Sequence, residues 1–139
     1  LVNSRDARNA ALATKALKEV EYPVERSATT IIALGDGTQE SHARMQAALD
    51  DQWTFAGELF ETDAGDETLN EMGIAPLPSS LRSRFDARAK AVLGAATLAI
   101  PETSFVHSGG RSGKQHSEHL GHLLTQMQWL QRAYPGATW

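Results

Sequence analysis

Apolar residues recur every three or four positions along most of this chain, which is the spacing of an amphipathic α-helix. The spacing predicts four long helices, at about residues 5–34, 38–60, 80–100 and 117–134, and one short helix at 67–72. No segment shows the alternation of apolar and polar residues that indicates a β-strand. The pattern therefore predicts an all-α protein built as a helical bundle.

Glycine, proline and capping residues predict where these helices end. Gly35-Asp36-Gly37 ends the first helix, and the hydroxyl of Thr38 is suited to cap the second. Pro23 lies inside the first helix, where it removes a backbone donor, so we expect a kink or two abutting helices there. Pro101 ends the third long helix, and Pro135 with Gly136 ends the last.

The helical spacing also predicts which side chains face the core. The expected inward positions are Ala13, Leu17, Val20, Val24, Ala28, Ile31, Leu34, Met45, Leu49, Trp53, Ala56, Phe60, Leu81, Phe85, Val92, Ala96 and Ala99. These positions lie on one face of each helix, which is the arrangement that a bundle needs.

The last segment, residues 116–139, has two stripes instead of one. Its apolar stripe consists of Leu120, Leu123, Met127, Leu130 and Tyr134. Beside it lies a polar and aromatic stripe of His119, His122, Gln126 and Trp129. A helix with two such faces needs cover on both, so we expect it to contact the bundle and a partner protein.

Composition and charge exclude several classes of function. The chain has 139 residues, enough for one domain with a core, and its net charge of −4 gives no reason to expect binding to nucleic acid or to anionic membrane. It has no cysteine, which excludes disulfides and thiolate metal sites. No apolar run approaches the roughly 20 residues that span a bilayer. We expect a cytoplasmic protein.

A di-iron carboxylate site is the boldest chemistry that a bundle of this kind could carry. Such sites use two Glu-x-x-His pairs, in which both side chains point from one helix face toward the same metal. No glutamate of this chain has a histidine three residues later. We therefore predict no metal ligands and no catalytic residues in this segment.

Two alternatives rest on residues 108–122. His116, His119 and His122 recur every third position and could hold zinc or iron, although polar packing is the simpler interpretation. The loop SGGRSGK at 108–114 departs from a nucleotide-binding loop, because serine replaces its first glycine and glutamine follows the lysine. Arg111 and Lys114 could still contact a phosphate or carboxylate. A small metal-binding or anion-binding helical module therefore stays an alternative.

Four motifs together resemble a known family. They are KEVEY at 18–22, LGDGTQESHARMQ at 34–46, SGGRSGKQHSEHLGHLL at 108–124 and MQWLQRAYPGATW at 127–139. With them the chain resembles the non-catalytic, structural subunit of the bacterial phenylacetyl-CoA 1,2-epoxidase, the multicomponent oxygenase of phenylacetate degradation. The resemblance covers nearly the whole chain but only the C-terminal half or so of a typical family member.

The resemblance implies a ferritin-like helical fold that pairs with a homologous di-iron catalytic subunit. That partner epoxidises the aromatic ring of phenylacetyl-CoA with O₂, and a reductase subunit of the wider complex supplies electrons. The structural subunit would scaffold the complex and bind no cofactor of its own. A di-iron oxygenase subunit with its own metal site is the competing interpretation, and it would need ligands from outside this segment.

On this interpretation residues 1–139 form a single ferritin-like domain that is incomplete at its N-terminal side. A bundle uses helices from both halves, so this segment alone would expose apolar faces. We expect His122, Trp129 and His119 to contact the partner. We also consider that Arg111 and Lys114 help to hold the phosphates of coenzyme A.

Overall fold

The chain is all-α in the computed structural model, which describes residues 1–111 and 113–138. Those residues contain no β-strand, so the predicted fold class is confirmed. The helices are α1 (Ala7–Gly35), α2 (Gln39–Ala56), α3 (Ala64–Glu71), α4 (Arg82–Ala95), α5 (His119–Met127) and α6 (Trp129–Ala133). Two 3₁₀ turns, η1 (Gly57–Phe60) and η2 (Pro78–Leu81), join α2 to α3 and α3 to α4.

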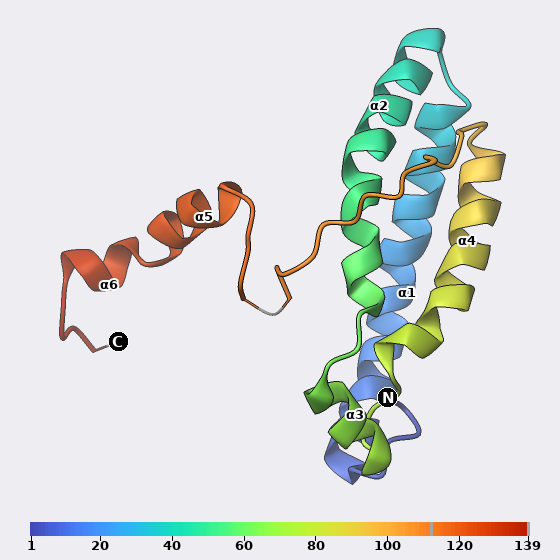
Figure 1. The fold of residues 1–139 in the computed structure, drawn as a ribbon. Helices are drawn as coiled ribbons and strands as arrows, with labels where there is room; N and C mark the ends of the chain where they lie inside the picture. Colours follow the sequence, from blue (N-terminus) through green and yellow to red (C-terminus); the bar gives the residue numbers. More distant parts are fainter. Residues whose placement is uncertain (112, 139) are drawn as a thin grey trace.

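Helices α1, α2 and α4 run side by side as a three-helix bundle, consistent with part of a ferritin-like fold (Figure 1). The short helix α3 lies at the end of the bundle where the chain begins (Figure 1). The buried core is small and consists of Leu93, Ala96 and Leu98. Half-buried apolar side chains from α1 and α2 pack against it, namely Ile31, Ile32, Met45, Leu49 and Trp53.

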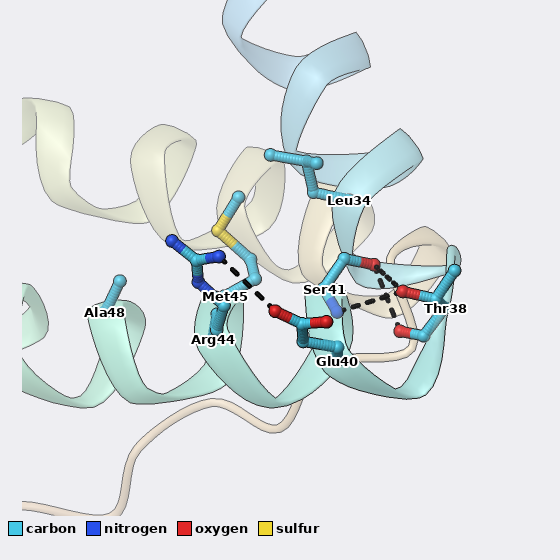
Figure 2. A pocket seen from close by; sticks show the side chains of 7 residues that line it. All are labelled: Leu34, Thr38, Glu40, Ser41, Arg44, Met45 and Ala48. Atoms are coloured by element: carbon cyan, nitrogen blue, oxygen red, sulfur yellow. Dashed lines mark hydrogen bonds and ion pairs between the residues drawn. The ribbon is translucent and has the colours of Figure 1, made fainter.

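The predicted boundary between the first two helices is confirmed. Helix α1 ends at Gly35, and the Thr38 hydroxyl accepts a hydrogen bond from the Ser41 backbone N–H at 3.1 Å. Figure 2 shows this cap beside an open hollow that Leu34, Met45 and Ala48 also line. In the same view Glu40 pairs with Arg44 at 3.5 Å, and both side chains are about four-fifths exposed. That pair is solvated, so it adds little to stability.

Helix α1 continues through Pro23 without interruption, so the alternative of two abutting helices is wrong. The third long helix differs from its prediction at both ends. It begins as the 3₁₀ turn η2, and it ends at Ala95, about five residues before the predicted end. Thr97 ends it, because its φ of +58° lies in the left-handed region, which an α-helix excludes.

The predicted core positions of the second helix, which lie in α2 and η1, are confirmed, whereas several on α1 are wrong. Met45, Leu49, Trp53, Ala56 and Phe60 are all partly buried. On α1, however, Leu17, Val20, Val24 and Leu34 are between 43% and 52% exposed. Only α2 and α4 pack along α1 in the described residues, so part of its apolar face has no neighbour. The expectation that this segment exposes apolar faces is therefore confirmed.

The last segment differs most from its prediction. Instead of one helix over 117–134, the structure has α5 and α6 with a break at Gln128. The two helices extend away from the bundle, joined to it by a long irregular segment (Figure 1). Their apolar stripe does not pack on the bundle: Leu123, Met127, Leu130 and Tyr134 are all exposed. Across residues 1–111 and 113–138, no helix combines the length and the apolar character required to cross a membrane.

Candidate functional site

We refer to residues 119–133, which form α5 and α6, as the arm. The residues predicted to contact a partner all lie on it and are all exposed: His119 begins α5, His122 follows within one turn, and Trp129 begins α6. Trp129 is 62% exposed. Large aromatic side chains of this kind contribute most to binding when a partner covers them. The arm is therefore the candidate partner-binding surface.

The three regularly spaced histidines do not form one helical face. His116 lies before α5 in irregular structure, so it does not continue the stripe of His119 and His122. Among the described residues, no three side chains of the types His, Cys, Asp and Glu lie close enough to share a metal ion. The geometry gives the metal-binding alternative no support.

Residues 101–111, which we call the strap, connect the bundle to the arm. The strap contacts α2 at His107, whose backbone N–H donates to the Thr54 carbonyl oxygen at 2.9 Å. The imidazole ring of His107 stacks on the Phe55 ring, with centroids 4.2 Å apart and planes within 2°. The Phe105 ring meets the same imidazole edge-on at 4.8 Å. The strap thus follows the C-terminal end of α2.

Gly57 allows the strap to approach the bundle closely. A Cβ atom at this position would lie 2.5 Å from Cγ1 of Val106, which is shorter than any real contact. Residue 57 must therefore lack a side chain for Val106 to lie where it does.

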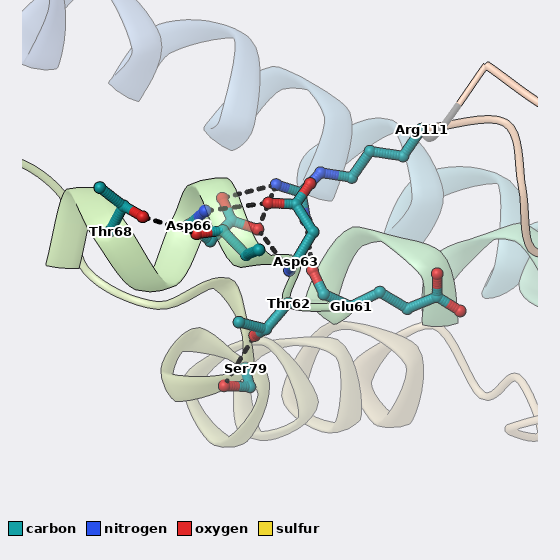
Figure 3. A network of polar contacts seen from close by, with 8 residues as sticks. Glu61, Thr62, Asp63, Asp66, Thr68, Ser79 and Arg111 are labelled. Atoms are coloured by element: carbon teal, nitrogen blue, oxygen red, sulfur yellow. Dashed lines mark hydrogen bonds and ion pairs between the residues drawn. The ribbon is translucent and has the colours of Figure 1, made fainter.

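Arg111 ends the strap with a group of hydrogen bonds to η1, to the loop after it and to the first turn of α3 (Figure 3). Its guanidinium donates to both carboxylate oxygens of Asp66 at 2.6 Å and also to the Glu61 carbonyl oxygen. Its backbone N–H donates to the Glu58 carboxylate at 2.5 Å. We call this group of contacts the Arg111 anchor.

The charges of the anchor change the pKa of both partners. The hydrogen bond from Arg111 lowers the pKa of the Asp66 carboxyl, and a second hydrogen bond, from the Asp63 backbone N–H, lowers it further. The same bond to Asp66 raises the pKa of the Arg111 guanidinium. Both groups are therefore charged at neutral pH, and the anchor is a charge-assisted pair.

Arg111 and Lys114, the residues predicted to contact an anion, lie in different surroundings from each other. Arg111 already binds a carboxylate, that of Asp66, whereas Lys114 is exposed. Ser112, in the middle of the glycine-containing loop, lies outside the described residues, as does Trp139 at the end of the last segment. The coenzyme A contact of Arg111 and Lys114 stays a prediction.

Sequence reasoning did not identify Asp66 as the partner of Arg111. Asp66 lies in a capping box, in which the Asp63 carboxylate accepts from the Asp66 N–H and the Asp66 carboxylate accepts from the Asp63 N–H. The spacing of the two aspartates could have predicted the start of α3. Nothing local could have predicted the ion pair, because 45 positions separate Asp66 from Arg111.

We call the groove between α1, α2 and α4 the valley; metal sites in helical bundles are built from side chains on facing helices, as its walls are. It is a groove of about 260 Å³ whose lining is almost entirely apolar, with Ile31, Leu49, Trp53, Phe85 and Val92 among its walls. The rings of Trp53 and Phe85 lie there with their centroids 6.2 Å apart. The lining contains no carboxylate or imidazole, so these residues do not fit a di-iron centre.

Comparison with known proteins gives two results. The sequence profile of the family described as "Phenylacetic acid catabolic protein" matches residues 1–139. The chain is also 42% identical, over all of its 139 residues, to a protein of Escherichia coli strain K12 that is named as one of the subunits of 1,2-phenylacetyl-CoA epoxidase. It spans 56% of the length of that relative. The all-helical fold is consistent with these two matches, and the chain belongs to the phenylacetic acid catabolic protein family.

Proposed function

We propose that this chain is a non-catalytic subunit that scaffolds the di-iron catalytic subunit of a phenylacetyl-CoA ring 1,2-epoxidase in aerobic phenylacetate catabolism. The observation that carries the proposal is the 42% identity, over the full chain, to the Escherichia coli epoxidase protein. That relative is by its name one part of an assembly, which supports a role that depends on partner subunits.

The apolar valley supports a non-catalytic role. Carboxylates and imidazoles are the ligands that bind iron in helical bundles. In this chain the corresponding space is lined by side chains such as Leu49, Trp53 and Phe85, which cannot coordinate a metal or move a proton. Chemistry on O₂ would then belong to the partner subunit, with electrons from a reductase subunit.

The exposed arm supports a role in binding. Its apolar side chains Leu123, Leu124, Met127 and Leu130 are between 39% and 67% exposed, and Trp129 is exposed beside them. A helix of nine residues is marginal in water, so the arm gains most from packing on another protein. We propose that His119, His122 and Trp129 bind the catalytic partner.

The proposal is tested by co-expressing the full-length form of this chain with the di-iron subunit and the reductase. We expect this chain and the di-iron subunit to co-purify. Epoxidation of phenylacetyl-CoA should disappear when this chain is omitted. Metal analysis of the separately purified chain gives the second readout.

Two results would overturn the proposal. Near-stoichiometric iron in this chain, with oxygen consumption in the absence of the partner, would make it a catalytic subunit. Zinc or iron that is lost in His119→Ala would instead support the small metal-binding module.

A further inference from the structure

The Arg111 anchor is the last hydrogen-bonded contact that the described residues show between the strap and the bundle. Among residues 113–138, every backbone hydrogen bond that the structure shows stays within the segment 109–137. The side-chain bond from Thr125 to the Gly121 carbonyl oxygen is also internal. Among the described residues, the hydrogen bonds that tie the strap and the arm to the bundle therefore end at Arg111.

The strap has other attachments besides the anchor, among them the stacking of His107 on Phe55. Just before the strap, Ala99 is held by the Gln46 side chain of α2. That side chain accepts from the Ala99 N–H at 2.9 Å and donates to the Ala99 carbonyl oxygen at 3.0 Å. Farther along, the His107 backbone N–H donates to Thr54. Phe105 and Val106 are 58% and 45% exposed, so solvent reaches a large part of the strap.

Arg111 lies among carboxylates that a solvent ion can reach. The charges of Asp66, Asp63 and Glu58 all act on its guanidinium. The side chains of Arg111 and Asp66 are 37% and 15% exposed, so the pair is neither buried nor fully solvated. A pair of this kind contributes more to stability than a fully exposed ion pair does, yet salt and competing cations still weaken it.

The buried residues of the bundle lie away from the anchor. Leu93 is in the last turn of α4, at the end that lies far from α3 (Figure 1), and Ala96 and Leu98 follow that helix. They pack against α1 and α2, and none belongs to the strap. Detachment of the strap would therefore leave in place the cover that α1 and α2 give these three residues.

From these contacts we propose that the Arg111 anchor is a releasable ionic latch. When it is closed, the strap lies along α2 and η1. When it opens, strap and arm detach together while α1, α2 and α4 stay packed. The latch gives the chain a way to move its partner-binding surface without unfolding. The latch itself is a property of the isolated chain, so its test is independent of the proposed function.

The test is hydrogen–deuterium exchange of the purified chain, read at single amides by NMR. The reporter is the His107 amide, which is protected only while the strap lies against Thr54. The reference is the Leu98 amide, which donates to the Leu93 carbonyl oxygen in the core. Arg111→Met opens the latch, and Arg44→Met, which breaks the solvated pair with Glu40, is the matched control.

In Arg111→Met we expect the His107 amide to exchange about five to ten times faster, because charge-assisted hydrogen bonds are lost. The exchange rate of the Leu98 amide should stay the same in this variant. Arg44→Met should change the exchange rate of neither amide. Raising the salt concentration from about 0.05 M to about 1 M should speed exchange at His107 in the natural chain but not in Arg111→Met.

Asp66→Asn separates the latch from a general loss of stability. It removes the negative charge of the pair but keeps the shape of the side chain, so it should speed exchange at the His107 amide as Arg111→Met does. In the double variant this amide should exchange no faster than in the faster of the two single variants. Unchanged exchange at His107, equal acceleration at Leu98, or additive effects of the two substitutions would each overturn the latch.

Discussion

Gly35, the last residue of α1, lies directly against Ala96 at the end of α4. A Cβ atom on residue 35 would be 2.5 Å from the Ala96 carbonyl oxygen and 2.8 Å from the Ala96 Cβ. Both residues are buried, and Ala96 belongs to the core. The contact joins the turn between α1 and α2 to the end of α4, so it aligns the three helices of the bundle.

Gly35→Ala should therefore destabilise the bundle. The added methyl group meets backbone and core atoms that cannot move away easily, and overpacking of this kind costs about 1–3 kcal/mol. Urea unfolding followed by far-UV circular dichroism measures the change. Gly94→Ala is the matched control, because a Cβ there meets nothing within 4 Å. In the helix α4 it should stabilise by about 0.5–1 kcal/mol. An equal loss of stability in both variants would show that the contact between residues 35 and 96 does not stabilise the bundle.

Thr38→Ala should weaken the start of α2. The variant loses the hydroxyl that accepts from the Ser41 N–H, and an N-cap of this type is worth about 1 kcal/mol. Thr38→Ser keeps the hydroxyl and should unfold at nearly the same urea concentration as the natural chain. If the serine variant is as weak as the alanine variant, the threonine methyl group, not the cap, is what stabilises this turn.

The pKa of Asp66 predicts how the anchor depends on pH. The carboxyl's pKa is lowered by the hydrogen bond from Arg111, so the folded state favours the charged form. The resulting stabilisation is fully present above the ordinary pKa of an aspartate and is lost as the pH falls through the lowered value. Glu58 and Asp63 face the same guanidinium, so their charges add to the field that holds it.

A ¹³C NMR titration of the side-chain carboxyl groups checks this prediction. The midpoint of Asp66 should lie below the usual aspartate range, and in Arg111→Met it should move upward. The hydrogen bond from the Asp63 N–H remains in that variant, so the shift should be reduced but not abolished. A midpoint that Arg111→Met leaves in place would show that the cap alone sets the pKa.

Trp129→Ala should weaken assembly with the catalytic partner more than it weakens folding. The indole is 62% exposed, so its loss should leave the urea midpoint unchanged. If a partner covers it, affinity should fall about tenfold or more, as for other aromatic interface residues. Affinity is measured by titrating the labelled chain with the di-iron subunit, with Lys90→Ala at an exposed position of α4 as the control. Equal losses of stability and affinity would place Trp129 in a core.

Local patterns predicted the parts of the fold that local interactions determine. The cap at Thr38 depends on Ser41, three positions away, and the inward positions Met45, Leu49 and Trp53 follow from the periodicity of one helix. Leu17 and Val20 follow the same periodicity yet are 52% exposed. Periodicity predicts which face of a helix is apolar but not whether a neighbour covers it.

The candidate site was predicted only in part for the same reason. The arm's residues His119, His122 and Trp129 stood out because one segment carried two stripes. Their detachment from the bundle, and the pairing of Arg111 with Asp66, depend on contacts between distant positions. The break at Gln128 has no proline or glycine beside it that could have predicted it.

Pro23 divides α1 into two halves that differ in how they are packed. Because proline has no backbone N–H, the Glu19 carbonyl oxygen lacks the donor that a helix would supply four residues later. Before this gap, only Ala10 and Ala13 are half-buried among residues 7–22, whereas after it Ala28, Ile31 and Ile32 pack toward the other helices. Opening of the weakly packed residues 7–22 can therefore stop at Pro23, where no backbone hydrogen bond has to break. One continuous helix of 29 residues thus consists of two units of unequal stability, of which the second belongs to the bundle's cooperative unit.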